Sequence, residues 1–63
     1  MGEYLINRIL KENFGKEVKI FLKNGFIHNC TIKEMDGISV LIHDDRSGSN
    51  KIIQISEITE VSF

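Results

Sequence analysis

The stretch 18–42, VKIFLKNGFIHNCTIKEMDGISVLI, contains the features that decide the fold of this 63-residue chain. Its first six residues alternate in character with a period of two, which indicates a strand. Asn24-Gly25 follows and is the strongest short hairpin signal in the chain. Asp36-Gly37 supplies a second turn. The stretch therefore predicts three strands, at about residues 18–23, 26–35 and 38–43.

The sequence on either side extends this pattern. Upstream, Leu5, Ile6, Ile9 and Leu10 recur at helical spacing, and Gly15 suits a left-handed helix end. Downstream, the polar segment 44–50 reads as a loop. We therefore expect a helix at about residues 3–13 and five strands within about 17–63, the last two at 51–55 and 58–63. Frequent turns between short strands favour a small barrel of the Sm, SH3-like or OB-like type.

Length and composition set further bounds. A chain of 63 residues forms one domain, expected here over 1–63, and a chain this short buries only about 60% of the surface it exposes when unfolded. Cys30 is the sole cysteine, so an internal disulfide and a zinc site built on several thiolates are excluded. We interpret Cys30 as a small buried apolar residue. Oligomerisation is then the expected supplement to a small core.

Charge and hydropathy point to a soluble protein. No apolar run approaches the roughly 20 residues that cross a membrane, and the first residues lack a secretory signal, so a cytoplasmic location without membrane contact is expected. The net charge is −1. Residues 1–33 carry six Lys/Arg and three Glu, whereas residues 34–63 carry two Lys/Arg and six acids. This asymmetry can give the domain two faces of opposite sign, although scattered solvated charge is the plainer interpretation.

Catalytic and metal-binding motifs are absent from the sequence. It has no phosphate-binding glycine loop, no HExxH pair and no nucleophile elbow. His28 and His43 fall on separate expected strands, without cysteines at ligand spacing. We therefore expect no enzyme activity, no metal and no cofactor.

The stretch 18–42 resembles the first Sm motif as it occurs in the Hfq family. Asn24-Gly25, Asp36 and the run 40–42 fall where that family has them, and residues 5–12 resemble its N-terminal helix. The resemblance implies a mainly β fold with one N-terminal helix and a strongly bent five-stranded antiparallel sheet, or small open barrel, assembled into a ring. Such rings are typically homohexamers in which the strand near Lys51–Ile55 pairs with that near Ile58–Phe63 of the next subunit.

The second Sm motif departs from the family. Gln54, Ile55 and Ser56 stand where the family has Tyr-Lys-His, and Gly37 and Ile38 replace a Gln and an aromatic residue. The pocket that binds uridine-rich ends thereby loses its cation, its imidazole and its stacking ring. A serine hydroxyl still donates and accepts hydrogen bonds but carries no charge. Conventional uridine binding is therefore not expected on this face.

The resemblance places a second RNA surface on the distal face. If alternate residues of the first strand face the core, Phe21 faces outward, where an aromatic ring can stack on bases. Asn24 is equally explained as a turn former. Matching distal positions are Phe21, Leu22, Asn24, Gly25, Phe26 and Asn29, and weaker rim or proximal positions are Arg8, Lys11, Lys16, Gly37, Ile38 and Ser56.

The resemblance implies an RNA chaperone and post-transcriptional regulator that binds A-rich single-stranded RNA. The missing Lys-His pair and the net charge of −1 motivate an alternative, a homo-oligomeric scaffold for protein interactions with weak or no RNA binding. A monomeric SH3-like module is a third interpretation, which a ring-sized mass would exclude.

Overall fold

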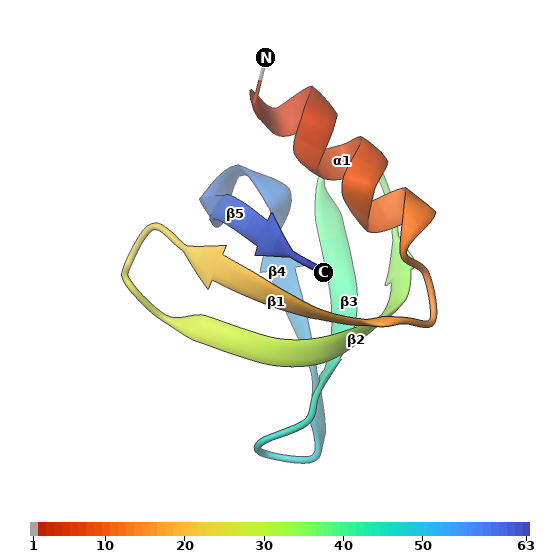
Figure 1. Ribbon diagram of the computed structural model, residues 1–63, viewed down its shortest axis with the longest axis vertical. Coiled ribbons are helices and arrows are strands. Elements are labelled where there is room, and N and C mark those ends of the chain that lie inside the picture. The colour runs from red at the N-terminus through yellow and green to blue at the C-terminus, as the bar shows by residue number, and fades with distance from the viewer. Residues whose placement is uncertain (1) are drawn as a thin grey trace.

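A computed structural model describes the backbone of residues 2–63 and the side chains of residues 5–63. It shows the predicted mainly β chain with an N-terminal helix (Figure 1). The strands begin and end close to the predicted positions. The elements are α1 (Gly2–Glu12), β1 (Glu17–Leu22), β2 (Ile27–Met35), β3 (Ser39–Asp44), β4 (Ser49–Gln54), the 3-10 turn η1 (Ile55–Glu57) and β5 (Ile58–Ser62).

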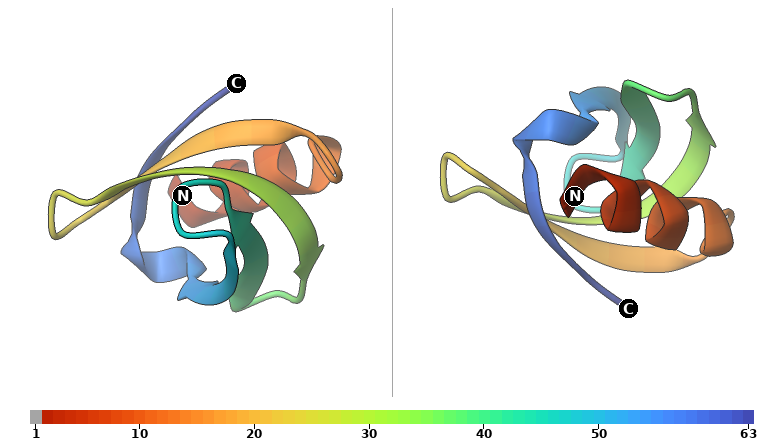
Figure 2. Two further views of the ribbon diagram at one scale, coloured as in Figure 1. Left: turned by 90° about the horizontal axis from the view of Figure 1, so that it is seen from below. Right: turned by 90° about the horizontal axis from the view of Figure 1, so that it is seen from above.

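The five strands form one antiparallel sheet in the order β4-β3-β2-β1-β5. The sheet bends strongly around its own core, as the two views in Figure 2 show, and β4 and β5 remain its two edges. The predicted bent, open five-stranded barrel is confirmed. Bulges in β2 and β5 contribute to the bend, because an extra residue on one strand increases local twist.

The core lies inside the bend. Alternation along β1 places Val18 and Ile20 inward, and the same alternation along β3 buries Val40 and Ile42. The helix α1 lies across one end of the barrel and adds Leu10, which is fully buried (Figure 1). Cys30 belongs to this core, as predicted.

Among the described residues, Gly15, Gly25 and Gly48 occupy left-handed backbone positions that other residues rarely adopt, and the first two shape the connections to β1 and β2. Gly15 (φ 76°) follows α1, and its N–H donates to the carbonyl oxygen of Ile32 at 2.9 Å, which ties the helix end to β2. Gly25 (φ 90°) completes the β1–β2 turn. Asn24 does not share a positive φ, so the turn has three residues, 23–25, rather than the two-residue type I′ form.

One detail differs from expectation. The loop expected at 44–50 is shorter, because Asp44 ends β3 while Ser49 and Asn50 begin β4. Phe14, which follows α1, is exposed. Within residues 2–63, no helix is both long and apolar enough to span a bilayer.

Candidate functional site

The outward surface of β1, β2 and β5 carries the strongest predicted site residue. In the sheet register, Phe21 pairs with Ile27 on β2 and with Glu60 on β5. These three residues lie on the face of the sheet that points away from the core, whereas Ile20 points toward the core. Phe21 is half-buried and turned away from the core, as its alternation predicts. We call residues Lys19, Phe21, Ile27, Asn29 and Glu60 the outer face.

The backbone beneath Phe21 is held by a bulge in β5. The register shifts between Phe21 and Leu22, so Thr59 has no cross-strand partner there. Its hydroxyl donates to the carbonyl oxygen of Phe21 at 3.2 Å. Bulges often re-aim side chains next to functional sites. Here the bulge contacts the Phe21 backbone and leaves Glu60 as the cross-strand partner of Phe21.

The tip of the β1–β2 hairpin extends this surface. Phe26 is 66% exposed and Ile27 is 52% exposed. The side-chain oxygen of Asn24 accepts the Phe26 N–H at 3.0 Å, so this oxygen serves the turn. Ile27 was not predicted as a site residue, although its pairing with Phe21 could have been derived by counting back from the turn.

The distal residues predicted from the sequence do not all come together. Asn29 lies on the outer face, cross-strand from Lys19, and Phe26 and Gly25 lie at its end. Leu22 instead packs partly against the core and lines a separate hollow with Asn24 between the hairpin and β4. The outer face is therefore narrower than the predicted distal set.

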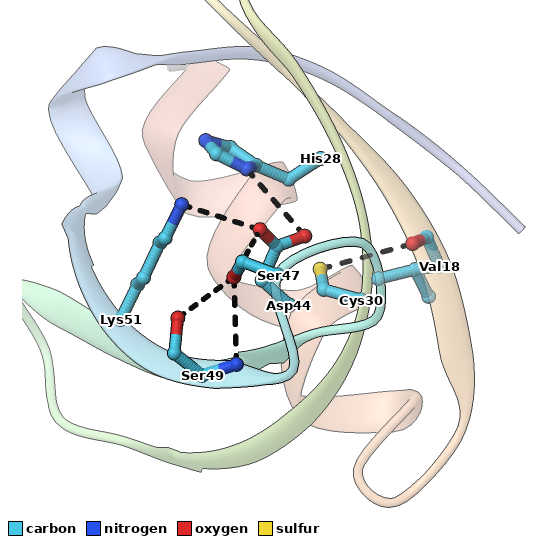
Figure 3. Close-up of polar contacts among 7 residues, drawn as sticks. All are labelled: Val18, His28, Cys30, Asp44, Ser47, Ser49 and Lys51. Carbon is cyan, nitrogen blue, oxygen red and sulfur yellow. Dashed lines mark hydrogen bonds and ion pairs between the residues drawn. The ribbon is translucent and has the colours of Figure 1, made fainter.

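A charged cluster of Asp44, Lys51 and His28, with the Ser47 hydroxyl, lies at the end of the barrel away from α1 (Figures 1 and 3). Asp44 is only 4% exposed. Its carboxylate accepts the Ser47 hydroxyl at 2.9 Å, lies 3.2 Å from Lys51 Nζ and lies 4.0 Å from His28 Nδ1. Asp44 was expected in the polar loop 44–50, but it is the last residue of β3, and the register of this strand turns its side chain inward beside Cys30.

These contacts make the stability of the protein depend on pH. The Ser47 hydroxyl, followed by Lys51 and the Arg46 backbone N–H, lowers the pKa of Asp44 below its ordinary value. A carboxylate with a lowered folded-state pKa stabilises the fold above its unfolded pKa of about 3.9, and this contribution is lost as the pH falls through the folded pKa.

We therefore expect Asp44→Asn to lower the free energy of unfolding at pH 7. The variant should also lose less of this free energy than the unmodified protein when the pH is lowered from 7 to about 3. Urea unfolding at pH 7 and at about pH 3 measures both values. Asp45→Asn is the control, since Asp45 is exposed. Equal acid sensitivity of Asp44→Asn and the unmodified protein would contradict this role for Asp44. Because Asp36 also has a lowered pKa, through the Ile38 and Ser39 N–H groups, some acid sensitivity will remain.

A cavity of about 290 Å³ opens beside the charged cluster. The first residues of β2 form one wall, and the β3–β4 turn with β4 forms the other. Lining residues are Phe26, Ile27, His28, Asn29, Asp44, Arg46 and Lys51. Ile27 and Asn29 also belong to the outer face, whereas His28 pairs with the inward Ile20, so the His28 and Asp44 side of the cavity lies on the opposite face of the β1–β2 pair from Phe21.

The three predicted basic rim residues do not lie together in the structure. Arg8 and Lys11 line a cavity of about 670 Å³ together with Asp36 and Gly37. Arg8 also forms an exposed ion pair with Glu12 at 3.4 Å, a kind of pair that contributes little to stability. Lys16 does not line this cavity and lies in the connection to β1.

The proximal residues lie near the start of η1. The Ile55 N–H donates to the carbonyl oxygen of Ile38 at 2.8 Å, while the Ile38 side chain is 72% exposed. Ile55 itself is buried, and Ser56 is exposed. This corner therefore presents an apolar side chain and a hydroxyl, consistent with the sequence departures noted above.

Cys30 is a buried and unreactive thiol in this structure. Burial, with the nearby charges of Asp45 and Asp44, raises the pKa of its thiol to about 11. Its Sγ donates weakly to the Val18 carbonyl oxygen at 3.8 Å (Figure 3). Since the thiolate is the reactive form, Cys30 is a core residue rather than a nucleophile. Within residues 5–63, no group of three His, Cys, Asp or Glu side chains gathers at metal-binding distance.

Comparison with known proteins establishes the fold. No protein-family model matches the sequence, and no curated protein matches it. Among solved structures, the chain is similar to the 1.55 Å crystal structure of the pleiotropic translational regulator Hfq. The TM-score is 0.81 at 23% identity, over 94% of this chain and 98% of that chain. The chain therefore has the Sm fold found in Hfq, and the resemblance predicted from the sequence is confirmed for the fold.

Proposed function

We propose that this chain forms a ring of identical subunits that binds single-stranded RNA on its outer face. The observation that carries the proposal is Phe21, an aromatic ring turned out of the core, with the Lys19–Asn29 pair two positions along the same face. Single-stranded RNA is held by bases stacked on aromatic rings and by hydrogen bonds to base edges. Phe21 supplies the ring, Asn29 an amide, and Lys19 a charge for phosphate.

Ring assembly is supported by the two edges of the sheet. Strands β4 and β5 each have a sheet neighbour on one side only, and Ile52 on β4 is 73% exposed. Unpaired edges with apolar side chains invite pairing with another chain, and closure into a ring removes them. We propose that β4 of one subunit pairs with β5 of the next, in a homohexamer.

The proposed ligand is A-rich RNA, and the proposed role is that of an RNA chaperone in post-transcriptional regulation in the cytoplasm, without catalysis. The similar structure is described as a translational regulator, which supports this role. Arg8 and Lys11, with Gly37 in the cavity beside α1, form a proposed second contact for phosphates at the rim. Ile38 and Ser56 are proposed only as weak proximal contacts, since neither carries charge.

A salt titration tests the proposal. Phosphate contacts release counterions, so affinity for RNA falls steeply as salt rises. We expect fluorescence anisotropy to show oligo-A binding at 50 mM salt that weakens by about tenfold or more at 200 mM. Oligo-U should bind more weakly at each salt concentration. No binding to oligo-A, oligo-U or mixed RNA at low salt would contradict RNA binding.

A protein-interaction scaffold is the second candidate. The observation that favours it is the exposed Ile38 at the corner where the sequence lacks the family's Lys-His pair. An intact ring that binds none of these RNAs would support the scaffold instead.

A further inference from the structure

We propose that Asn24 is a site of spontaneous covalent modification, where water converts the asparagine to aspartate and isoaspartate at a rate set by opening of the β1–β2 turn. This inference goes beyond RNA binding and does not depend on it. The reacting groups are the Asn24 side chain and the backbone nitrogen of Gly25, and water is the only co-reactant.

The reaction closes a succinimide ring within the chain. The Gly25 nitrogen attacks Cγ of Asn24 and gives up its proton, while the bond from Cγ to Nδ2 breaks and ammonia leaves. Water then opens the ring. Attack of water at Cγ gives aspartate, whereas attack at the backbone carbonyl carbon gives isoaspartate, in which the chain runs through Cβ. One water is consumed and one ammonia is released, without oxidation or reduction.

Asn24 is the only asparagine in the sequence that is followed by glycine. A side chain on the following residue crowds the attacking nitrogen, and glycine has none. Asn24 and Gly25 are both exposed, and they lie in the turn between two strands. We therefore expect Asn24 to react before the asparagines that precede larger residues, which are Asn7, Asn13, Asn29 and Asn50.

The folded turn holds both reacting groups in place. The Gly25 N–H donates to the carbonyl oxygen of Leu22 at 3.0 Å, and the Asn24 side-chain oxygen accepts the Phe26 N–H at 3.0 Å. Attack requires the nitrogen to turn from the Leu22 oxygen toward Cγ and the amide to rotate, so both bonds must break. Hydrogen bonds at an exposed loop tip open more readily than the core does. The reaction therefore proceeds from a locally opened turn.

The second turn provides a comparison within the same chain. Asp36-Gly37 has the same spacing, and an aspartate can form the same ring by loss of water. An ionised carboxylate is a poor target for a nitrogen nucleophile. The Ile38 and Ser39 N–H groups, at 2.8 and 2.7 Å, lower the pKa of Asp36 and keep its carboxylate ionised at neutral pH. We expect Asp36 to react more slowly than Asn24, whose amide carries no charge.

The products alter the end of the hairpin. Isoaspartate adds a backbone atom to the three-residue turn at 23–25. Either product adds one negative charge to a chain whose net charge is −1. This charge lies beside the exposed Phe26, at the end of the outer face. If the outer face binds RNA as proposed, the charge repels phosphates, and affinity falls as the protein ages.

Peptide mapping of the full chain by tandem mass spectrometry tests the proposal. One sample is kept folded at neutral pH, and a second is kept unfolded in guanidinium chloride at the same pH and temperature. We expect Asn24 to be the first asparagine converted in both samples, with both products present. Conversion should be about tenfold slower in the folded sample, because two exposed hydrogen bonds must open first.

Gly25→Ala and Gly48→Ala provide a matched pair of variants. Each replaces an exposed glycine of positive φ by the same residue, with open space for the added methyl group. In guanidinium chloride, where folding does not matter, Gly25→Ala should slow conversion of Asn24 severalfold and Gly48→Ala should leave its rate unchanged. Equal rates in the two variants overturn the assigned attack by the Gly25 nitrogen.

Three results with the unmodified chain would also overturn the proposal. They are earlier conversion of another asparagine, equal rates at Asn24 in the folded and unfolded samples, and an intact Asn24 in the folded sample after a period about a hundredfold longer than the unfolded sample requires. The assay contains no RNA, so its failure leaves the proposed RNA binding untouched.

Discussion

Replacing Phe21 with alanine should weaken binding to oligo-A by about tenfold or more, because each base stacked on an aromatic ring contributes about 1–3 kcal/mol. The effect is expected to be large because Phe21 is the ring at the centre of the outer face, with its backbone held by the Thr59 hydroxyl. The β-strand itself should persist, since Phe21 is turned away from the core. Fluorescence anisotropy with labelled oligo-A measures the change.

Phe14→Ala is the matched control for this experiment. Phe14 is also an exposed phenylalanine, but it lies between α1 and β1 and lines neither the outer face nor the cavity beside Asp44. Its replacement should leave oligo-A affinity within about twofold. A Phe21→Ala protein that keeps its oligomeric mass and binds oligo-A as tightly as the unmodified chain would refute the assignment of this subsite.

Replacing the preceding residue, Ile20, should have a different consequence. Ile20 is fully buried in the core, and truncating a buried isoleucine to alanine costs about 2–5 kcal/mol. Small domains have total stabilities near the low end of about 5–15 kcal/mol, so much of the stability should be lost. Urea unfolding monitored by circular dichroism measures the change.

Lys19, the exposed residue that precedes Ile20 in β1, provides the control for Ile20→Ala. Lys19 shares the outer face with Phe21, and Lys19→Ala should change stability by no more than about 0.5 kcal/mol. The three substitutions at positions 19–21 therefore test the register of β1 directly. A loss below about 1 kcal/mol for Ile20→Ala would mean that β1 does not turn this residue inward.

Most of the fold could be predicted because its signals are local. The period of two in 18–23 gives β1 and the orientation of Phe21, and the pair Asn24-Gly25 gives the turn. The helix follows from the spacing of its apolar residues, and Leu10 is buried as that spacing requires. Each of these features depends on residues only a few positions apart.

The charged cluster could not be predicted, because it depends on the register of three strands. His28, Asp44 and Lys51 meet only because Cys30 pairs with Asp44 and Ile42 pairs with Lys51. In the sequence, Asp44 stands in a polar run that reads as a loop. A shift of one residue in β3 would have turned its side chain to the other face.

Only part of the candidate site could be predicted, because its membership also depends on the register of neighbouring strands. Phe21, Phe26 and Asn29 were predicted from the pattern and the family resemblance; the register puts Phe21 and Asn29 on the outer face, and Phe26 is exposed at the end of the hairpin. Ile27 was missed, since an apolar residue in a strand is usually assigned to the core. Leu22 was included but lies partly against the core.

Native mass spectrometry of the full chain, with and without short oligo-A and oligo-U, tests the central claim most directly. A closed ring that binds RNA predicts one dominant species of several subunits, six copies of the 7.2 kDa chain in the proposed hexamer. That species should gain the mass of bound oligo-A, and should gain oligo-U less readily. A 7.2 kDa monomer at every concentration, with no RNA adduct, would contradict both the ring and its function.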